Sequence, residues 1–397
     1  MTSGSQVLAR EGNAFVPCFR ASLGQEEKDA VLAVLESGWL TTGPRAKEFE
    51  AQFAAFTGAS HAVALSSCTA ALHLALAALG LREGDEVVLP TMTFASSAEV
   101  VLYFGARPVL VDSGPGLFHM DTEQIEAAIT PRTRAIIPVH YSGYAYQLDH
   151  ILEIAKRHGV KIVEDAAHAF PSSYQGKMIG TFGDITCFSF YATKTITTGE
   201  GGMLTTEDAE IADRVRILSL HGISRDAWKR YTSEGSWRYD IGAIGYKYNL
   251  TDLQAAIGIA QLQKCEAMRA RRAAIAERYT RELSSMEGFL APAAAPAQVE
   301  NAWHLYVVQV DTEVLRLNRD QVIEELKARG IGSSVHFIPL HLHSLYQQYC
   351  GYREGQFPNA EKHFSGAISL PFFADLGFEE QGRVLEALRD IAKSYRR

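Results

Sequence analysis

Cysteine is scarce in this sequence, with only five residues in a chain of 397. They lie far apart, at Cys18, Cys68, Cys187, Cys265 and Cys350, and no two have the C-x-x-C spacing. Disulfide frameworks and structural zinc sites both need sets of suitably spaced cysteines, so this pattern argues against either. An odd, dispersed set of thiols is typical of a protein in a reducing compartment.

Long apolar runs and an excess of positive charge are also absent. No stretch approaches the ~20 apolar residues of a membrane-spanning helix, and residues 1–19 lack the apolar core of a signal peptide. Lysine and arginine number 38 against 46 aspartates and glutamates, and the formal net charge is -8. This balance disfavours a nucleic-acid or anionic-membrane surface as a partner. We expect a cytoplasmic protein that acts on small molecules, without nucleic acid or membrane partners.

Short apolar runs alternate with helical patterns in the first half of the chain. Seven runs are predicted strands, at 61–67, 85–90, 107–112, 134–140, 160–165, 185–190 and 202–206. Several are apolar at successive residues, which is typical of strands covered on both faces. Helical patterns at 69–80 and 96–105 separate the first of them. The order predicts an α/β fold with a mostly parallel seven-stranded sheet and helices on both faces.

The pattern changes after residue 250. A single long helical pattern covers 250–283, and the sequence APAAAPA at 291–297 then breaks it. A predicted strand at 303–310 and a predicted helix at 319–330 follow, which indicates a smaller C-terminal α+β domain. We therefore predict an N-terminal segment near the small domain, a large domain, a connecting helix and a small domain, at 1–30, 31–250, 251–290 and 291–397.

Ligands of open α/β sheets bind beyond the carboxyl ends of the strands, so the residues just after each apolar run are the candidates. The first strand runs into Ser66, Ser67 and Cys68, and Thr69 opens the following helix. Free N–H groups at such a helix start suit a phosphate. Ordinary N-capping by serine or threonine is the alternative.

Other strand ends carry an acid, an aromatic ring and a lysine. Asp165 ends a predicted buried strand and needs a cation or a strong donor, because an isolated buried carboxylate is costly. His168 follows it, although a core histidine is the ordinary alternative. Phe94 comes after another strand, where a ring is usually part of the core. Ser189 lies in the strand that leads to Lys194, and a lysine there is usually a solvated turn residue.

One ligand requires all of these groups, namely pyridoxal 5′-phosphate. Its phosphate takes a helix start, its pyridinium nitrogen takes a carboxylate, and its ring stacks on an aromatic side chain. Its aldehyde takes a lysine, which needs a lowered pKa to act as nucleophile and base near neutrality. The combination predicts that Lys194 forms the Schiff base with this cofactor.

Segments along nearly the whole chain carry a resemblance to a known family, at 37–76, 85–112, 163–169, 188–202, 245–258, 336–347 and 369–373. The most specific are VEDAAHA at 163–169 and FSFYATKTITTGEGG at 188–202. The sequence resembles the DegT/StrS family of pyridoxal-phosphate-dependent nucleotide-sugar aminotransferases. The resemblance implies the aspartate-aminotransferase-like fold, fold type I, with the cofactor bound by the large domain.

The resemblance also implies roles for individual residues. Lys194 matches the Schiff-base lysine, and Asp165 matches the carboxylate that pairs with the pyridine nitrogen. Phe94 falls where the family places an aromatic residue over the ring, and His168 falls where a histidine or glutamine packs against the other side. Lys194, Asp165 and His168 are thus the expected catalytic residues.

The phosphate site follows from the same resemblance. Ser189 matches a phosphate-binding serine, while Cys68 and Thr69 match a Gly-Thr pair that cradles the phosphate. Cys68 replaces the usual glycine, and a backbone contact would survive that change. Asn249, with Lys247 as the second choice, is expected to reach the phosphate of the neighbouring subunit, which implies a homodimer with shared active sites.

The implied activity is transfer of an amino group from L-glutamate to a nucleotide-linked keto sugar, through the pyridoxamine 5′-phosphate form of the cofactor. Variants in the family segments favour a UDP- or dTDP-linked 4-keto-6-deoxyhexose or 4-ketopentose. A C3-keto sugar or a keto-inositol is an alternative. A non-catalytic pyridoxal-phosphate-binding regulator and a sugar dehydratase or lyase are alternatives of another class. Family dehydratases carry histidine in place of the lysine, so Lys194 argues for transamination.

Residues for the nucleotide are harder to identify. Residues 37–44, Arg225 and the histidines of HFIPLHLH (His336, His341 and His343) are candidates at the mouth of the cleft. The three histidines resemble a metal site only superficially, since no carboxylate or cysteine completes a ligand set there. We expect no metal.

Overall fold

A computed structural model of the protein describes residues 15–223 and 239–397. Its main element is a seven-stranded sheet with the order β1-β9-β8-β5-β4-β2-β3. The strands are β1 (His61–Leu65), β2 (Glu86–Pro90), β3 (Arg107–Val111), β4 (Thr133–Ile136), β5 (Lys161–Asp165), β8 (Ile185–Ser189) and β9 (Gly202–Thr206). All neighbouring pairs are parallel except those of β9, which is antiparallel to β1 and β8. The predicted mostly parallel, seven-stranded sheet is confirmed.

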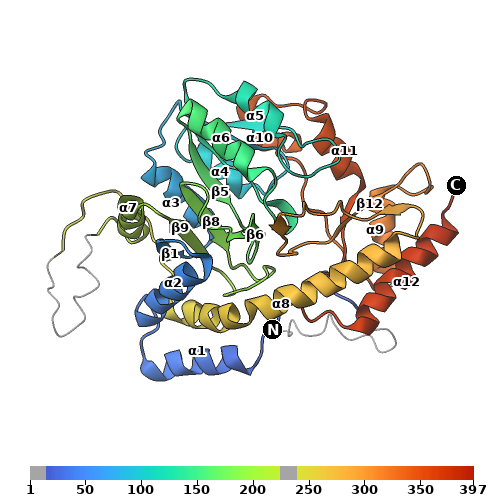
Figure 1. Cartoon of the computed structure of the whole chain (residues 1–397), viewed down its shortest axis with the longest axis horizontal. Coiled ribbons are helices and arrows are strands. Elements are labelled where there is room, and N and C mark those ends of the chain that lie inside the picture. The colour runs from blue at the N-terminus through green and yellow to red at the C-terminus, as the bar shows by residue number, and fades with distance from the viewer. Residues whose placement is uncertain (1–14, 224–238) are drawn as a thin grey trace, which may run out of the picture.

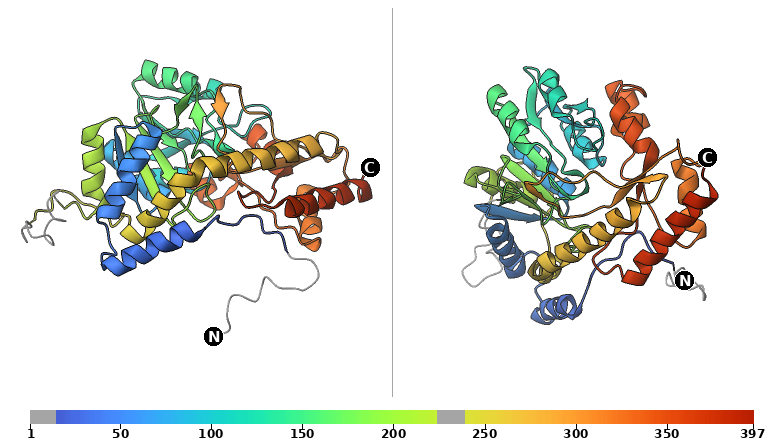
Figure 2. Two further views of the ribbon diagram at one scale, coloured as in Figure 1. Left: turned by 60° about the horizontal axis from the view of Figure 1, so that its bottom comes forward. Right: turned by 45° about the vertical axis from the view of Figure 1, so that its right-hand side comes forward.

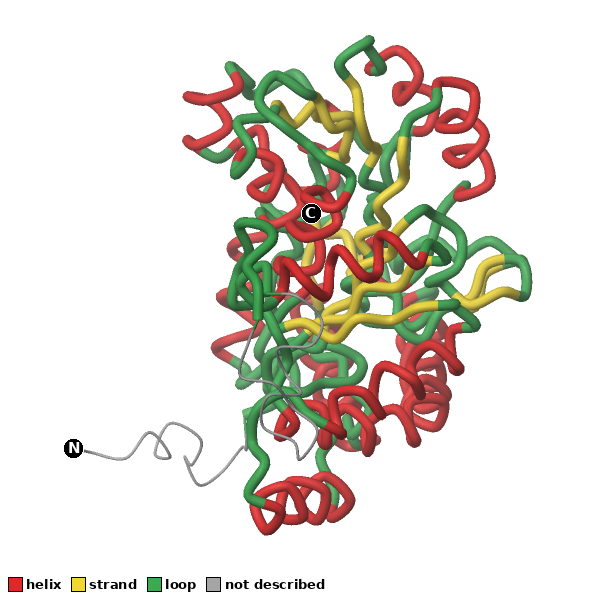
Figure 3. The backbone as a smooth tube through the Cα atoms, turned by 90° about the vertical axis from the view of Figure 1, so that its left-hand side faces the viewer, coloured by secondary structure: helices red, strands yellow, loops and turns green. Residues whose placement is uncertain are grey.

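Helices cover both faces of this sheet because alternate strand residues point to opposite sides. Val163 and Leu204 pack into one core with α3 (Cys68–Ala78), α4 (Ser96–Leu102) and α7 (Ala209–Ser219). Their neighbours Ile162 and Met203 face the other side, which is covered by α2 (Pro44–Thr57), α5 (Thr122–Ala128), α6 (Leu148–His158) and part of α8. Figure 3 shows the strands inside and the helices around them.

The helix α8 (Asp252–Leu283) links the two ends of the molecule (Figure 1). Its 32 residues span about 48 Å at the usual rise per residue. Thr251 and Gln254 form a capping box at its start, which explains why the helix begins there. Its first half packs on α1 (Gln25–Ser37) and α2, as both views of Figure 2 show for α1, and it also contacts α12 (Phe378–Ser394).

The C-terminal part has its own antiparallel sheet of β10 (Phe289–Leu290), β12 (Val307–Val310) and β13 (Ala367–Ser369). A second core joins Tyr306 of this part to Tyr279 at the end of α8, and it also includes Val16, which pairs with Ile331. The strand expected at 303–310 is observed only at Val307–Val310, and the φ of 53° at Trp303 already excludes the first predicted residue from the strand region. The domain boundaries themselves stay predictions.

Smaller elements complete the described residues. They are β6 (Ser173–Tyr174), β7 (Lys177–Met178), β11 (Val299–Glu300), η1 (Tyr141–Gly143), α9 (Arg319–Ala328), η3 (Leu340–Leu342), α10 (Ser344–Cys350) and α11 (Pro358–Gly366). Across residues 15–223 and 239–397, no helix combines the length and apolar character needed to cross a membrane.

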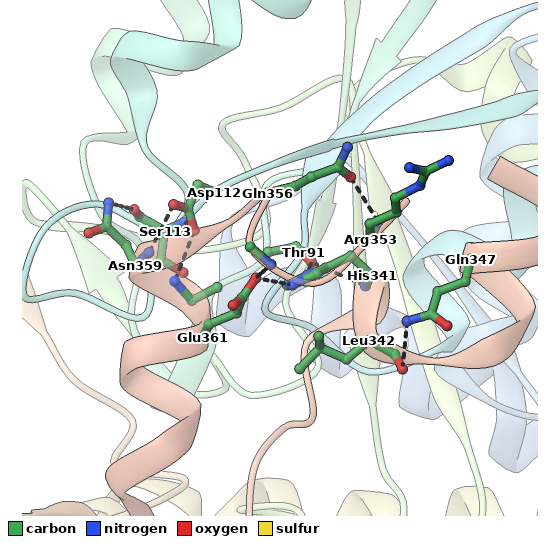
Figure 4. A network of polar contacts seen from close by, with 12 residues as sticks. Thr91, Asp112, Ser113, His341, Leu342, Gln347, Arg353, Gln356, Asn359 and Glu361 are labelled. Atoms are coloured by element: carbon green, nitrogen blue, oxygen red, sulfur yellow. Dashed lines mark hydrogen bonds and ion pairs between the residues drawn. The ribbon is translucent and has the colours of Figure 1, made fainter. Parts of the chain in front are cut away.

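A buried polar network ties the carboxyl edge of the large sheet to the C-terminal part (Figure 4). Asp112, just after β3, accepts hydrogen bonds of 3.0 and 2.9 Å from two backbone N–H groups at the start of α11. His341 lies between Thr91 and Glu361, at 2.8 and 2.9 Å. Burial lowers the pKa of His341, although Glu361 opposes this. The neutral ring can therefore accept from Thr91 and donate to Glu361.

Candidate functional site

The start of α3 is an anion-binding feature built by the turn after β1. The hydroxyl of Ser67 accepts a hydrogen bond from Ala70 N (3.0 Å), and the Ser67 carbonyl accepts one from Ala71 N (3.1 Å). The N–H groups of Cys68 and Thr69 have no hydrogen-bond partner among the described residues. These two free donors stand at the positive end of the helix dipole, where a phosphate group is favoured.

The register of the sheet brings Ser189 and Gly202 into line with this turn. Gly202 pairs with Leu65 on one side and with Ser189 on the other. A Cβ atom at Gly202 would lie 2.4 Å from the carbonyl carbon of Ser67 and 2.6 Å from the nitrogen of Cys68. Only glycine therefore lets β9 lie this close to the start of α3.

Asp165 ends β5 on the face that α3 and α4 cover. Its side chain is 4% exposed and accepts a hydrogen bond of 2.7 Å from the Ser97 hydroxyl and one of 3.1 Å from Ala167 N. The sequence predicted that this acid needs a strong donor, and Ser97 of α4 is that donor. A carboxylate has about four acceptor positions, so two donors leave room for a further partner.

Lys194 follows β8 in a loop whose backbone is fixed by a hydrogen bond from Lys194 N to Tyr191 O (2.9 Å). Burial lowers the pKa of its amine from 10.5 to about 8, while Cys68 and Asp165 raise it. Its Nζ has no hydrogen-bond or ion-pair partner in the described parts of the chain. The structure thus brings an unpaired amine together with Asp165 and the start of α3.

His168 is buried beside Lys194. Its Nδ1 accepts a hydrogen bond from Ser142 N (3.3 Å), so the ring proton resides on Nε2. Burial lowers the pKa of His168 well below its usual value, and Lys194 and His336 lower it further. The ring is therefore neutral near pH 7, and it stacks 5.7 Å from the ring of Phe337.

Phe94 is unusually exposed for a phenylalanine, at 59%. Its ring lies 5.8 Å from the ring of Phe337 and is not a core residue, which was the ordinary alternative from the sequence. An exposed ring next to the buried polar groups offers a stacking surface for a planar ligand.

Asn249 lies beside β1, the edge strand of the sheet, whereas Lys247 pairs with Leu220 just after α7. Asn249 pairs with Leu65, and its side-chain amide donates to the Thr42 hydroxyl (2.6 Å). The amine of Lys247 donates to the side-chain oxygen Oδ1 of Asn249 (2.6 Å). Asn249 therefore lies beside the end of β1 with the Lys247 amine next to it, and the contact expected with a neighbouring subunit stays a prediction.

The candidate nucleotide-binding residues do not form one group. His336 lies near Lys194, and burial together with Lys194 lowers its pKa to about 4. His341 is buried in the polar network of Figure 4, and His343 is exposed at the start of α10. No set of three metal-ligating side chains gathers among the residues described. Arg225 lies outside the described residues.

Sequence reasoning missed several residues of the site. His304 is buried, and its ring lies 4.3 Å from the ring of His168 at a tilt of 44°. Burial and the nearby charges lower its pKa well below the usual value. Tyr141 and Phe337 line the same region. Ser97 gave no signal either, because its contact with Asp165 joins residues 68 positions apart. His304 lies within the predicted strand at 303–310, and a strand pattern gives no sign that its histidine belongs to the site.

These residues fit pyridoxal phosphate. The site offers two free N–H donors for a phosphate, a carboxylate with unused acceptor capacity, an unpaired amine with a pKa of about 8 and an exposed aromatic ring. The nearby histidines His168, His304 and His336 all have lowered pKa values and are neutral, so they place no further positive charge beside a cationic ring.

Comparisons with known proteins agree with this chemistry. A model of the DegT/DnrJ/EryC1/StrS aminotransferase family matches residues 21–389. The chain is 47% identical over 387 residues to the spore coat polysaccharide biosynthesis protein SpsC of Bacillus subtilis (strain 168), covering 97% of this chain and 99% of that protein.

Two solved structures are similar over nearly the whole chain. The putative sugar aminotransferase Spr1654 from Streptococcus pneumoniae, in its PMP form, has a TM-score of 0.90 and 34% identity, covering 96% of this chain and 99% of that one. The same protein is also known in a PLP form. PseC from Helicobacter pylori, an aminotransferase involved in the biosynthesis of pseudoaminic acid, has a TM-score of 0.88 and 28% identity, covering 96% and 100%.

Proposed function

The chain belongs to the DegT/DnrJ/EryC1/StrS aminotransferase family of pyridoxal-phosphate-dependent sugar aminotransferases, and we propose that it moves an amino group from L-glutamate to a nucleotide-linked keto sugar. The observation that carries this proposal is the unpaired amine of Lys194 beside Asp165, at the start of α3. The preferred sugar is a UDP- or dTDP-linked 4-keto-6-deoxyhexose or 4-ketopentose. The role of SpsC in spore coat polysaccharide biosynthesis and the description of Spr1654 as a putative sugar aminotransferase support a sugar substrate.

Lys194 carries the proton transfers. Pyridoxal phosphate, when bound, supplies an electron sink for the carbanion that forms when a proton leaves the donor. The neutral amine of Lys194 takes that proton from the α-carbon of L-glutamate. In the second half of the reaction it delivers a proton to the sugar carbon that gains the amino group. A pKa of about 8 leaves part of the amine neutral near pH 7, so both directions are accessible.

The other groups of the site would hold the cofactor in place. Asp165 would pair with the ring nitrogen and stabilise its positive charge. The exposed ring of Phe94 would offer a stacking surface on one side of the cofactor ring, and the neutral His168 would pack against the other side without adding a second positive charge beside Asp165. The buried position of His168 also keeps water away from the reacting amine.

The phosphate is bound by the free N–H groups of Cys68 and Thr69 and by the hydroxyl of Ser189. Asn249, or else Lys247, completes this site in the partner subunit of a homodimer. Exposed apolar side chains support a dimer interface near these residues, because Ile241 and Ile244 are 62% and 91% exposed just before Lys247.

An absorption spectrum of the purified protein, before and after addition of L-glutamate, tests this function. Visible absorption that bleaches with glutamate and returns with a keto-sugar nucleotide, with release of 2-oxoglutarate and an amino sugar, would support it. A panel of 4-keto and 3-keto sugar nucleotides and a keto-inositol, ranked by the rate of colour return, identifies the acceptor. Absorption that does not respond to any amino donor would favour a regulator, dehydratase or lyase. Failure to bind pyridoxal phosphate would overturn the proposal.

A further inference from the structure

A chain of buried hydroxyl groups ends on Asp165. The Thr93 hydroxyl lies 2.7 Å from the Ser97 hydroxyl, which lies 2.7 Å from Oδ2 of Asp165. Thr93, Ser97 and Asp165 are 1%, 0% and 4% exposed, so bulk water does not reach these contacts. These hydrogen bonds therefore lie in the protein interior and do not belong to a surface network.

The direction of the hydrogen bonds follows from the acid. An ionised carboxylate can only accept, so the Ser97 proton points to Asp165. The Ser97 oxygen is then free to accept, and Thr93 donates to it. Ala167 N donates to the other carboxylate oxygen at 3.1 Å, so both oxygens are fixed by donors from different segments. Together the two donors fix the plane of the carboxylate.

Ser97 lies in the first turn of α4 (Ser96–Leu102), whose N-cap residue is Ala95 and offers no side-chain acceptor. The Ser97 hydroxyl is directed across to β5, to a residue 68 positions away. Thr93 also directly precedes the exposed Phe94, so one short segment supplies both the stacking ring and the support of the acid.

We propose that Ser97, backed by Thr93, is a positioning residue that keeps the carboxylate of Asp165 oriented towards the ring nitrogen of the cofactor. This inference rests on the proposed function, in which Asp165 pairs with that nitrogen. Without the Ser97 hydroxyl, Oδ2 loses its donor in a place that water does not reach. The carboxylate can then turn, and the ring nitrogen holds its proton less firmly.

The test compares binding of two compounds to the full-length apoprotein: pyridoxal phosphate and its deaza analogue, in which C–H replaces the ring nitrogen. The affinity for pyridoxal phosphate divided by the affinity for the analogue isolates the contact between Asp165 and the nitrogen. We expect Ser97→Ala to reduce this ratio about tenfold, the effect of one lost hydrogen bond to a charged group. With ¹⁵N-labelled cofactor, the ring-nitrogen resonance should also shift towards the unprotonated form.

Thr186→Val is the matched control. The Thr186 hydroxyl donates to Glu164 at 2.8 Å, so this change removes the same type of bond from the neighbouring buried acid, on the other face of β5. It should leave the affinity ratio and the resonance unchanged. If Ser97→Ala does not fold, Thr93→Val removes the first hydroxyl of the chain and should shift both readouts in the same direction, by less.

The outcomes separate this inference from the function on which it rests. An unchanged ratio and resonance in Ser97→Ala, with a clear loss in Asp165→Asn, would overturn the role of Ser97 and keep that of Asp165. A wild-type protein that binds both compounds equally would overturn the role of Asp165 and this inference together. An equal loss of the affinity ratio in Ser97→Ala and Thr186→Val would mean that the Ser97 contact only stabilises the fold, and it would also overturn the inference.

Discussion

Replacing Gly202 by alanine should damage the phosphate site without touching any proposed functional side chain. The new Cβ would lie 2.4 to 2.6 Å from backbone atoms of Ser67 and Cys68, whereas ordinary contacts begin at 3.4 Å. The start of α3 and β9 must therefore separate by about 1 Å, and overpacking of this kind costs about 1–3 kcal/mol. Because the displaced atoms include the free N–H of Cys68, part of this cost should appear as weaker cofactor binding, by about tenfold.

The assay is titration of the apoprotein with pyridoxal phosphate, followed by absorbance, together with urea unfolding of the same samples. Gly382→Ala in α12 is the control, because a Cβ at Gly382 meets only the Arg278 guanidinium, at an ordinary 3.7 Å, and its φ is not positive. That change should leave affinity unaltered and be neutral or slightly stabilising. If Gly202→Ala binds the cofactor as tightly as Gly382→Ala does, the close approach of β9 is not what shapes the site.

Three further predictions concern single groups. Lys194→Ala should prevent covalent attachment of the cofactor, checked by mass spectrometry after borohydride reduction; a reduced adduct at another lysine with normal turnover would contradict the assignment. In the wild type, attachment should accelerate as pH rises through about 8, because burial lowers the pKa of Lys194 and only the neutral amine attacks; a rate independent of pH around that value would refute this. Glu361→Leu should destabilise the protein by about 1–3 kcal/mol in urea unfolding, because His341 loses its acceptor, while Glu361→Gln should cost less; equal costs would contradict the network.

Much of the large sheet could be predicted from the sequence because each strand is a short apolar run with a recognisable end. The same logic located Asp165 and Lys194, since ligand-binding residues follow the strands of such sheets. The antiparallel direction of β9 was not predictable in this way, because an apolar run carries no information on strand direction. Its reversal depends on the short connection from β8 through the loop that contains Lys194.

The rest of the site depends on contacts between distant segments. Ser97 contacts Asp165, which is 68 positions away in the sequence. His304 contacts the ring of His168, although the whole of α8 lies between them in the sequence. Neither residue has a periodic or capping pattern that marks it in the chain. The cradle at Gly202 was equally hidden, because its requirement for glycine comes from the backbone of Ser67 and not from a turn of its own.

The adjacent acids Glu164 and Asp165 show how the sheet decides which of two similar residues serves a ligand. Glu164 is fully buried and accepts hydrogen bonds from His140 (2.7 Å), Gly183 N (2.8 Å) and the Thr186 hydroxyl (2.8 Å). Its partners are all protein groups on the face away from α3, so its role is structural. Asp165, one residue later, must point to the opposite face. There it accepts from two donors among the described residues and lies close enough to Lys194 to raise the pKa of its amine, so it is the acid with capacity for a cationic ring.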